Sequence, residues 1–141
     1  MSQSNTRTGD IPVTAGEDLA GMEDRLVKLA DASGKTVAKL PEANGDFVPF
    51  LVIEGTANGK TASLRPLHAD RNVRVPLKGT CNPGDTLVLA DVATAADKGK
   101  VRALPTAPGT YRGLLIAEQA GVEGQLVLAR PAPWIGNITV T

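Results

Sequence analysis

The sequence predicts an all-β protein: a small sandwich or barrel of short antiparallel strands with an extended N-terminal arm. Three observations support this fold class. Apolar runs of four to eight residues recur along the chain, turn-forming pairs separate them, and no long stretch has a sustained helical period. The 15 glycines and 10 prolines of the 141 residues fall between the apolar runs, as expected of a chain with many turns.

The N-terminal residues 1–20 are polar, small and turn-prone, so we expect a flexible arm outside the core that orders on a partner. Residues 21–141 then form the β-rich domain. One segment, AGEDLAGMEDRL, has a helical spacing of Leu19, Met22 and Leu26. Gly21 in its middle disfavours that helix by about 1 kcal/mol relative to alanine.

Ten later segments carry the apolar runs expected of strands. In chain order they are RLVKLAD, KTVAKL, DFVPFLVIEG, TASLRPL, NVRVPL, DTLVLAD, KVRAL, YRGLLIAE, GQLVLARP and NITVT. The alternation of Val73, Val75 and Leu77 with more polar neighbours is typical of a strand with one buried face. Pro76 in the same segment indicates an edge strand or a bulge.

Specific turn pairs connect these segments. Ser33-Gly34, Asn44-Gly45 and Asn58-Gly59 contain residues that tolerate positive φ, and each therefore predicts a hairpin. Pro83-Gly84 and Pro108-Gly109 fit the centre of a type II turn. We expect these two pairs to form corners between strands.

Charge and composition argue against several classes of function. Lysine plus arginine and aspartate plus glutamate each number 15, so no basic excess is present to attract nucleic acid. One cysteine and one histidine cannot form an internal disulfide or supply four zinc ligands. No signal-peptide pattern and no membrane-length apolar run occur, so we expect a protein made in the cytoplasm that has no membrane partner.

Cys81 is a candidate nucleophile because it precedes the Pro83-Gly84 turn and is the single thiol of the chain. A catalytic thiol needs a base, and His68 is the one histidine that could serve. Free cysteine at the end of a strand more often behaves as a small buried apolar side chain. We therefore expect Cys81 to pack beside the corner, and a cysteine hydrolase is the less favoured alternative.

A second candidate is the lysine of a carrier domain. The stretch NPGDTLVL resembles the Pro-Gly-Asp turn of biotinyl and lipoyl carrier domains, in which a hairpin tip presents the modified lysine. Asp97-Lys98-Gly99 would correspond to that tip, but Ala95 and Ala96 stand where acidic residues and methionines usually flank the lysine. We favour a solvated hairpin turn here, and a carrier domain remains the alternative.

No other pattern points to chemistry. The segment DASGKT lacks the first glycine of a phosphate-binding loop, because Leu29 occupies that place. Neither a G-x-S-x-G motif nor a recognisable acid and base pair of carboxylates occurs. We therefore predict no catalytic, cofactor-binding or metal-ligating residues, and a protein that is not an enzyme.

The chain has four aromatic residues, Phe47, Phe50, Tyr111 and Trp134, fewer than a nucleic-acid or sugar platform normally uses. Trp134 lies in RPAPWIGNIT, between prolines and a glycine, where a regular strand is hard to continue. It either caps the open end of the core or anchors an interface.

The segments IPVTAGEDLAGMEDRLVKLADASGKTV, VRVPLKGTCNPGDTLVLAD, GKVRALP and GLLIAEQAGVEGQLVLARPAP together resemble the capsid decoration, or cement, proteins of tailed bacteriophages. The resemblance covers about residues 11–133. The chain departs from the usual family pattern in PEANGDFVPFLVIEGTANGK and in the C-terminal WIGNITVT.

This resemblance implies a structural virion protein that binds the outer surface of an assembled phage head and stabilises it across subunit boundaries. The implied partner is the major capsid protein, with a homotrimer on the capsid and without a cofactor. We expect apolar residues of the arm and of the C-terminal segment to contact the capsid or a neighbouring subunit: Ile11, Pro12, Val13, Leu19, Trp134 and Ile135.

Overall fold

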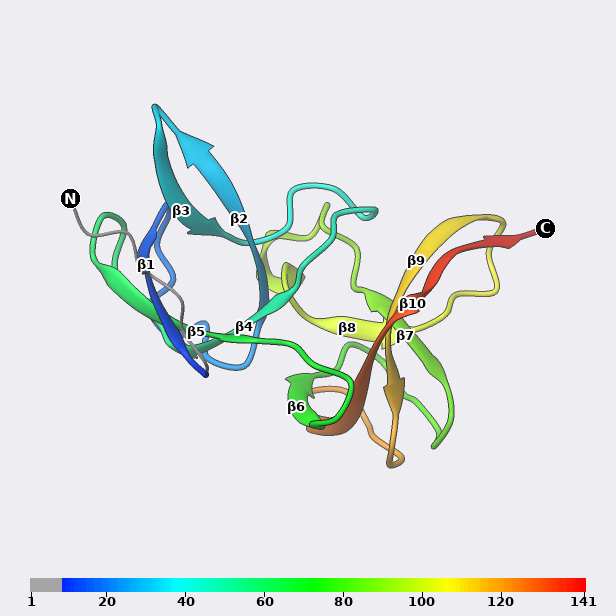
Figure 1. Ribbon diagram of the computed structural model, residues 1–141. Coiled ribbons are helices and arrows are strands. Elements are labelled where there is room, and N and C mark those ends of the chain that lie inside the picture. The colour runs from blue at the N-terminus through cyan, green and yellow to red at the C-terminus, as the bar shows by residue number, and fades with distance from the viewer. Residues whose placement is uncertain (1–8) are drawn as a thin grey trace.

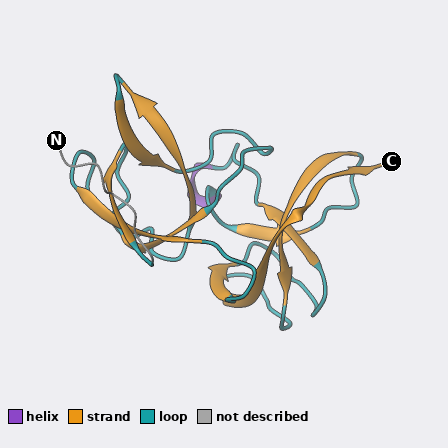
Figure 2. Ribbon diagram, viewed as in Figure 1, coloured by secondary structure: helices purple, strands orange, loops and turns teal. Residues whose placement is uncertain are grey.

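The computed structural model describes residues 9–141, which form two β-units side by side (Figure 1). Strands and loops make up nearly all of this part of the chain, and one short 3₁₀ turn, η1 (Ala95–Asp97), is its single helical element (Figure 2). The all-β prediction is therefore confirmed. Among the described residues, no helix has the length and apolar character needed to cross a bilayer.

The N-terminal unit is a closed barrel with the strand order β1-β3-β2-β4-β5. Its strands are β1 (Ile11–Ala15), β2 (Leu26–Ala32), β3 (Lys35–Lys39), β4 (Phe50–Glu54) and β5 (Thr61–Pro66). β1 closes the barrel by pairing antiparallel with β5 and parallel with β3. This parallel pair departs from the predicted purely antiparallel arrangement.

The C-terminal unit is a five-stranded antiparallel sheet with the order β6-β10-β9-β7-β8. Its strands are β6 (Val73–Pro76), β7 (Thr86–Leu89), β8 (Val101–Ala103), β9 (Gly109–Ala117) and β10 (Leu126–Val140). GQLVLARP and NITVT, which were expected as separate strands, both belong to β10. The pairing of β10 with β9 shifts register between Pro131 and Gly136.

The strand NVRVPL has the predicted geometry. Val73, Val75 and Leu77 are buried, whereas Arg74 is exposed. Pro76 is the last residue of β6, which lies at one edge of the sheet. An edge accommodates proline because its missing N–H is not needed for a second neighbour.

A shared hydrophobic core joins the two units. Leu26 and Leu51 of the barrel and Val48, between β3 and β4, pack with buried residues of the C-terminal sheet such as Leu89 and Leu115. A separate core fills the barrel itself and consists of Ala15, Leu19, Val27, Ala38, Leu40, Val52, Ala62 and Leu64. The barrel therefore contributes side chains to both cores.

Hydrogen bonds reinforce this junction. The Arg25 guanidinium donates to the carbonyl oxygens of Ala96 and Lys98 at 2.8 and 2.9 Å. The Leu26 N–H donates to the Gly99 carbonyl oxygen at 2.9 Å. The start of β2 is thus bonded to the segment that connects β7 with β8.

The placement of residues 1–20 outside the core is wrong for residues 11–19. Residues 11–15 form β1, and both Ala15 and Leu19 are buried in the barrel. A five-residue strand with only Ile11 and Val13 as large apolar side chains carries too little periodicity to stand out in the sequence. Residues 1–8 of the predicted arm lie outside the described residues.

The helix suggested by the spacing of Leu19, Met22 and Leu26 does not form. Gly21 and Asp24 have φ values of 75° and 69°, which a right-handed helix cannot contain. The chain instead makes two successive turns, in which the Met22 N–H donates to the Leu19 carbonyl oxygen and the Arg25 N–H to that of Met22.

Most predicted turns occur where expected. Ser33-Gly34, with φ values of 53° and 82°, forms the β2–β3 hairpin. Asn58-Gly59 lies in the connection between the paired strands β4 and β5. Pro83-Gly84 turns the chain ahead of β7. The type II turn predicted at Pro108-Gly109 does not form, because Gly109 is the first residue of β9 and has a φ of 157°. The hairpin predicted at Asn44-Gly45 is wrong, because β2 lies between β3 and β4 in the barrel.

Candidate interaction surface

Two of the four aromatic side chains lie on the protein surface. Phe47 is 49% exposed and Trp134 is 67% exposed. The other large exposed apolar residues of the described chain are Leu29, Val122 and Leu126. Phe47 belongs to the stretch PEANGDFVPFLVIEGTANGK, and Trp134 begins the C-terminal stretch WIGNITVT.

A recess of about 290 Å³ separates the β3–β4 connection from the β9–β10 ribbon. We name it the Phe47 recess and define it by its lining residues, Phe47, Arg112, Gly113, Pro133 and Gly136. A smaller adjoining hollow of about 40 Å³ shares Phe47 and Pro133 and is otherwise lined by Val48, Pro49, Leu67, Leu114 and Pro131. The two together form a continuous, mainly apolar surface.

Arg112 gives this apolar surface a positive charge. Its guanidinium carbon lies 5.3 Å from the centroid of the Phe47 ring, a distance typical of a cation–π contact. Among residues 9–141 no carboxylate lies within ion-pair distance of Arg112. The recess therefore combines an exposed ring, one proline and a cation that lacks an anionic partner within the described chain.

The base of the recess is backbone, because Gly113 pairs directly with Gly136 across the ribbon. A Cβ atom at Gly113 would lie 2.5 Å from Cγ2 of Ile135. Ile135 thus covers Gly113 so closely that a larger residue would displace it.

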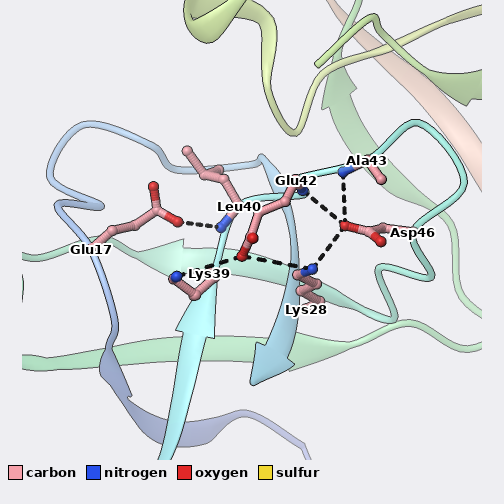
Figure 3. A network of polar contacts seen from close by, with 7 residues as sticks. All are labelled: Glu17, Lys28, Lys39, Leu40, Glu42, Ala43 and Asp46. Atoms are coloured by element: carbon pink, nitrogen blue, oxygen red, sulfur yellow. Dashed lines mark hydrogen bonds and ion pairs between the residues drawn. The ribbon is translucent and has the colours of Figure 1, made fainter. Parts of the chain in front are cut away.

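A polar network holds the loop that presents Phe47 (Figure 3). Oδ2 of Asp46 accepts hydrogen bonds from the N–H groups of Glu42 and Ala43, at 2.8 and 3.1 Å, and from the Lys28 ammonium at 2.9 Å. Burial tends to raise the pKa of Asp46, but these hydrogen bonds and the charge of Lys28 outweigh it and lower the pKa. The residue before Phe47 is therefore fixed as a carboxylate.

Further contacts fix the same loop at its start and in its middle. A Glu17 carboxylate oxygen accepts the Leu40 N–H at 3.0 Å (Figure 3). The Asn44 side chain accepts the Val92 N–H at 2.9 Å and donates to Asp91 at 3.3 Å. The loop is thereby bonded to the barrel on one side and to the β7–β8 connection on the other.

Four of the six predicted interface residues lie in the barrel unit. Ile11, Pro12 and Val13 are on β1, where Ile11 and Val13 are half-buried against the barrel core and Pro12 is exposed. Leu19 is fully buried. A surface contact through Leu19 is therefore excluded in this conformation.

Trp134 and Ile135 lie in the other unit, on β10 at the register shift. β1 and β10 are on opposite sides of the molecule (Figure 1), so the structure does not bring the six residues together. The expectation that Trp134 caps the core is wrong, because β10 continues through this point and directs the indole outward. The role of these residues in an interface stays a prediction.

Cys81 packs as expected at the end of the β6 segment. It is 5% exposed, its thiol lies 3.7 Å from the Gln119 carbonyl oxygen, and its backbone bridges to Gly121. Burial, together with the charge of Asp85, raises the pKa of the thiol. The Cys81 thiol therefore lacks the features of an activated nucleophile. The hydrogen bond that His68 makes is to Asp70, through Nδ1 at 2.7 Å, on the exposed surface.

Asp97-Lys98-Gly99 is not the solvated hairpin turn that the sequence suggested. The carbonyl groups of Lys98 and Gly99 accept the junction hydrogen bonds described above. Asp97 is 7% exposed and accepts a hydrogen bond from Lys100 at 3.0 Å. That bond, assisted by the charge of Lys78, lowers the pKa of Asp97.

Phe47 and Arg112 were not among the residues predicted from the sequence. They are far apart along the chain, and the fold alone brings them together. The available signal was the position of Phe47 between Asp46 and Pro49, in a stretch with the turn-forming residues Asn44 and Gly45.

No family model matches the sequence, and no curated protein matches it. The fold is similar to the crystal structure of the head fiber gp8.5 N base in bacteriophage phi29, with a TM-score of 0.66 and 15% sequence identity. The superposition covers 88% of this chain and 93% of that chain. The barrel and the C-terminal sheet are thus both within the shared architecture, and the likeness is one of fold.

Proposed function

We propose that this protein is a structural component of a tailed-phage virion that attaches to the outer surface of the assembled head. The observation that carries the proposal is the fold shared with a phage head fiber base over 88% of this chain and 93% of the other. The sequence resemblance to capsid decoration proteins, over about residues 11–133, supports the same class by a separate route.

The proposed partner is the major capsid protein, bound where shell subunits meet. A protein that bridges such a boundary stabilises the shell because separating the subunits would expose the area it covers. A standard interface buries about 800 Å² per partner, and the protein exposes 7455 Å² in total. One such contact would therefore use about a tenth of the surface.

We further propose that the protein attaches as a homotrimer. Three linked contacts can raise the avidity by about 10² to 10⁴ over a single contact. The formal net charge is zero, so long-range attraction contributes little and moderate salt should change attachment only slightly.

The alternatives draw less support from the site geometry. A cysteine hydrolase would need an accessible, activated thiol, and Cys81 is buried with a raised pKa. A carrier domain would need a protruding lysine, and the backbone at Lys98 is bonded to Arg25.

The test is binding of the purified protein to mature heads, unexpanded shells and isolated shell subunits of the phage that encodes it, across a salt series. We expect tight, salt-tolerant binding to mature heads and weak binding to free subunits. Heads of an unrelated phage serve as the control. Equal affinity for all three forms would place the binding site within one subunit, and absence of binding to heads would exclude the proposed function.

A further inference from the structure

The Phe47 recess has the properties of a binding surface for an extended polypeptide. Its volume of about 290 Å³ matches only the smallest typical small-molecule pockets, of about 300 Å³. Its walls are Phe47 and Pro133, and its base is the paired backbone of Gly113 and Gly136. A surface of this kind accommodates one apolar side chain and leaves the backbone at Gly136, where nothing lies within 4 Å of a Cβ position, open to close approach.

An unpaired strand edge lies beside the recess. β6 pairs with β10 only from Leu126 to Ala129, whereas β9 pairs with the other side of β10 as far as Val140. From Arg130 onward, β10 therefore has no strand neighbour on one side among residues 9–141. Such an edge binds an extended segment through main-chain hydrogen bonds.

The two prolines limit where this added pairing can occur. Pro131 and Pro133 have no N–H to donate. The register shift covers residues 132–135 and Gly136 has a φ of 69°, so a regular edge that both donates and accepts begins at Asn137. Gly136, which lines the recess, directly precedes this part of β10, and a segment that paired here would reach the recess at its end.

The charge of Arg112 defines a second requirement for the occupant. Its guanidinium contacts the Phe47 ring at 5.3 Å and has no carboxylate partner in the described chain. Covering an unpaired guanidinium with an apolar segment would be costly. A carboxylate on the incoming segment would remove that cost through a charge-assisted, bidentate hydrogen bond.

We propose that the Phe47 recess binds an extended segment of the capsid shell protein in which an apolar side chain lies next to an aspartate or glutamate. The segment adds as a strand to the free edge of β10, its apolar side chain enters the recess, and its carboxylate pairs with Arg112. This inference rests on the proposed function and assigns the surface through which attachment occurs.

The first experiment measures the affinity of purified variants for mature heads. Phe47→Ala removes the ring and should weaken binding about tenfold, as expected for an aromatic anchor. Arg112→Glu should weaken it more than tenfold, whereas Arg112→Lys, which keeps the charge but loses the planar fork, should weaken it only about threefold. Circular dichroism and melting temperature establish that each variant is folded.

Matched controls use exposed residues of the barrel, away from the recess. Lys35→Glu makes the same change of charge at the β2–β3 hairpin, and Leu29→Ala removes an apolar side chain that is 38% exposed on β2. Both should bind heads as the wild type does. Equal losses in the controls and the recess variants would overturn the assignment.

The second experiment replaces Phe47 with the photoreactive residue p-benzoylphenylalanine and irradiates the protein on heads. We expect a crosslinked shell peptide in which an acidic residue lies within about three positions of the attachment point. Crosslinks to a second copy of this chain, or to no polypeptide, would overturn the proposal.

The outcomes separate the two proposals. If the wild type binds heads and folded recess variants bind equally well, the recess is not the attachment surface, but the proposed function stands. If the wild type does not bind heads, the proposed function fails and the assignment of the recess to a shell segment fails with it.

Discussion

Replacing Leu26 with alanine should destabilise both β-units together. Leu26 begins β2 of the barrel and is fully buried, but its side chain packs in the core shared with the C-terminal sheet. Its N–H donates to the Gly99 carbonyl oxygen. The substitution therefore opens a cavity at the junction without removing a backbone hydrogen bond.

The magnitude follows from burial. A fully buried leucine replaced by alanine costs about 2–5 kcal/mol of unfolding free energy, because a cavity term adds to the lost transfer free energy. With about 2.1 cal/mol/K of unfolding entropy per residue, the 141 residues give about 0.3 kcal/mol/K. A loss of about 3 kcal/mol then lowers the melting temperature by about 10 °C.

The assay combines urea unfolding with hydrogen exchange read separately over β1–β5 and β6–β10. Leu29→Ala on the same strand is the control, since a leucine that is 38% exposed should cost less than about 1 kcal/mol. The reasoning is refuted if Leu26→Ala costs no more than the control. It is also refuted if one unit loses protection while the other keeps it, because a shared core would then not couple them.

Three further predictions concern single positions. Gly55→Ala should destabilise the protein by about 2 kcal/mol or more, because its Cβ would overlap the Leu19 carbonyl oxygen. Gly45→Ala is the control: its Cβ would meet nothing within 4 Å, so the melting temperature should not change. Native Cys81 should resist iodoacetamide over hours and react once urea unfolds the chain, and rapid native labelling would contradict its burial. Because the folded-state pKa of Asp97 is lowered, its stabilisation is present above the unfolded pKa of about 3.9 and lost as pH falls toward the folded value. Asp97→Asn should therefore reduce stability at pH 7 more than at pH 3, and an equal loss at both would count against the ion pair.

Local patterns predicted the strands well because a strand and its turn are encoded within a few residues. The alternation at Val73, Val75 and Leu77 and the positive-φ pair Ser33-Gly34 required no information about distant parts of the chain. β1 was missed because its pairing with β3 and β5, and not its own pattern, makes it a strand. The hairpin predicted at Asn44-Gly45 was wrong for a related reason. The residues of a turn do not determine which strands pair with each other.

The candidate surface was less predictable than the fold. Trp134 could be identified from its unusual setting, but its exposure depends on the register shift in β10. Phe47 and Arg112 meet only because the β3–β4 loop packs near the β9–β10 ribbon. No local pattern encodes a contact between segments so far apart in sequence.

The stretch that carries Phe47 combines buried and exposed positions. Val48, Leu51 and Val52 are buried in the two hydrophobic cores, whereas Phe47 is 49% exposed. Buried positions are constrained by packing, whereas exposed positions can change without loss of the fold. A substitution at Phe47 is therefore expected to alter the recess surface and to leave both cores intact.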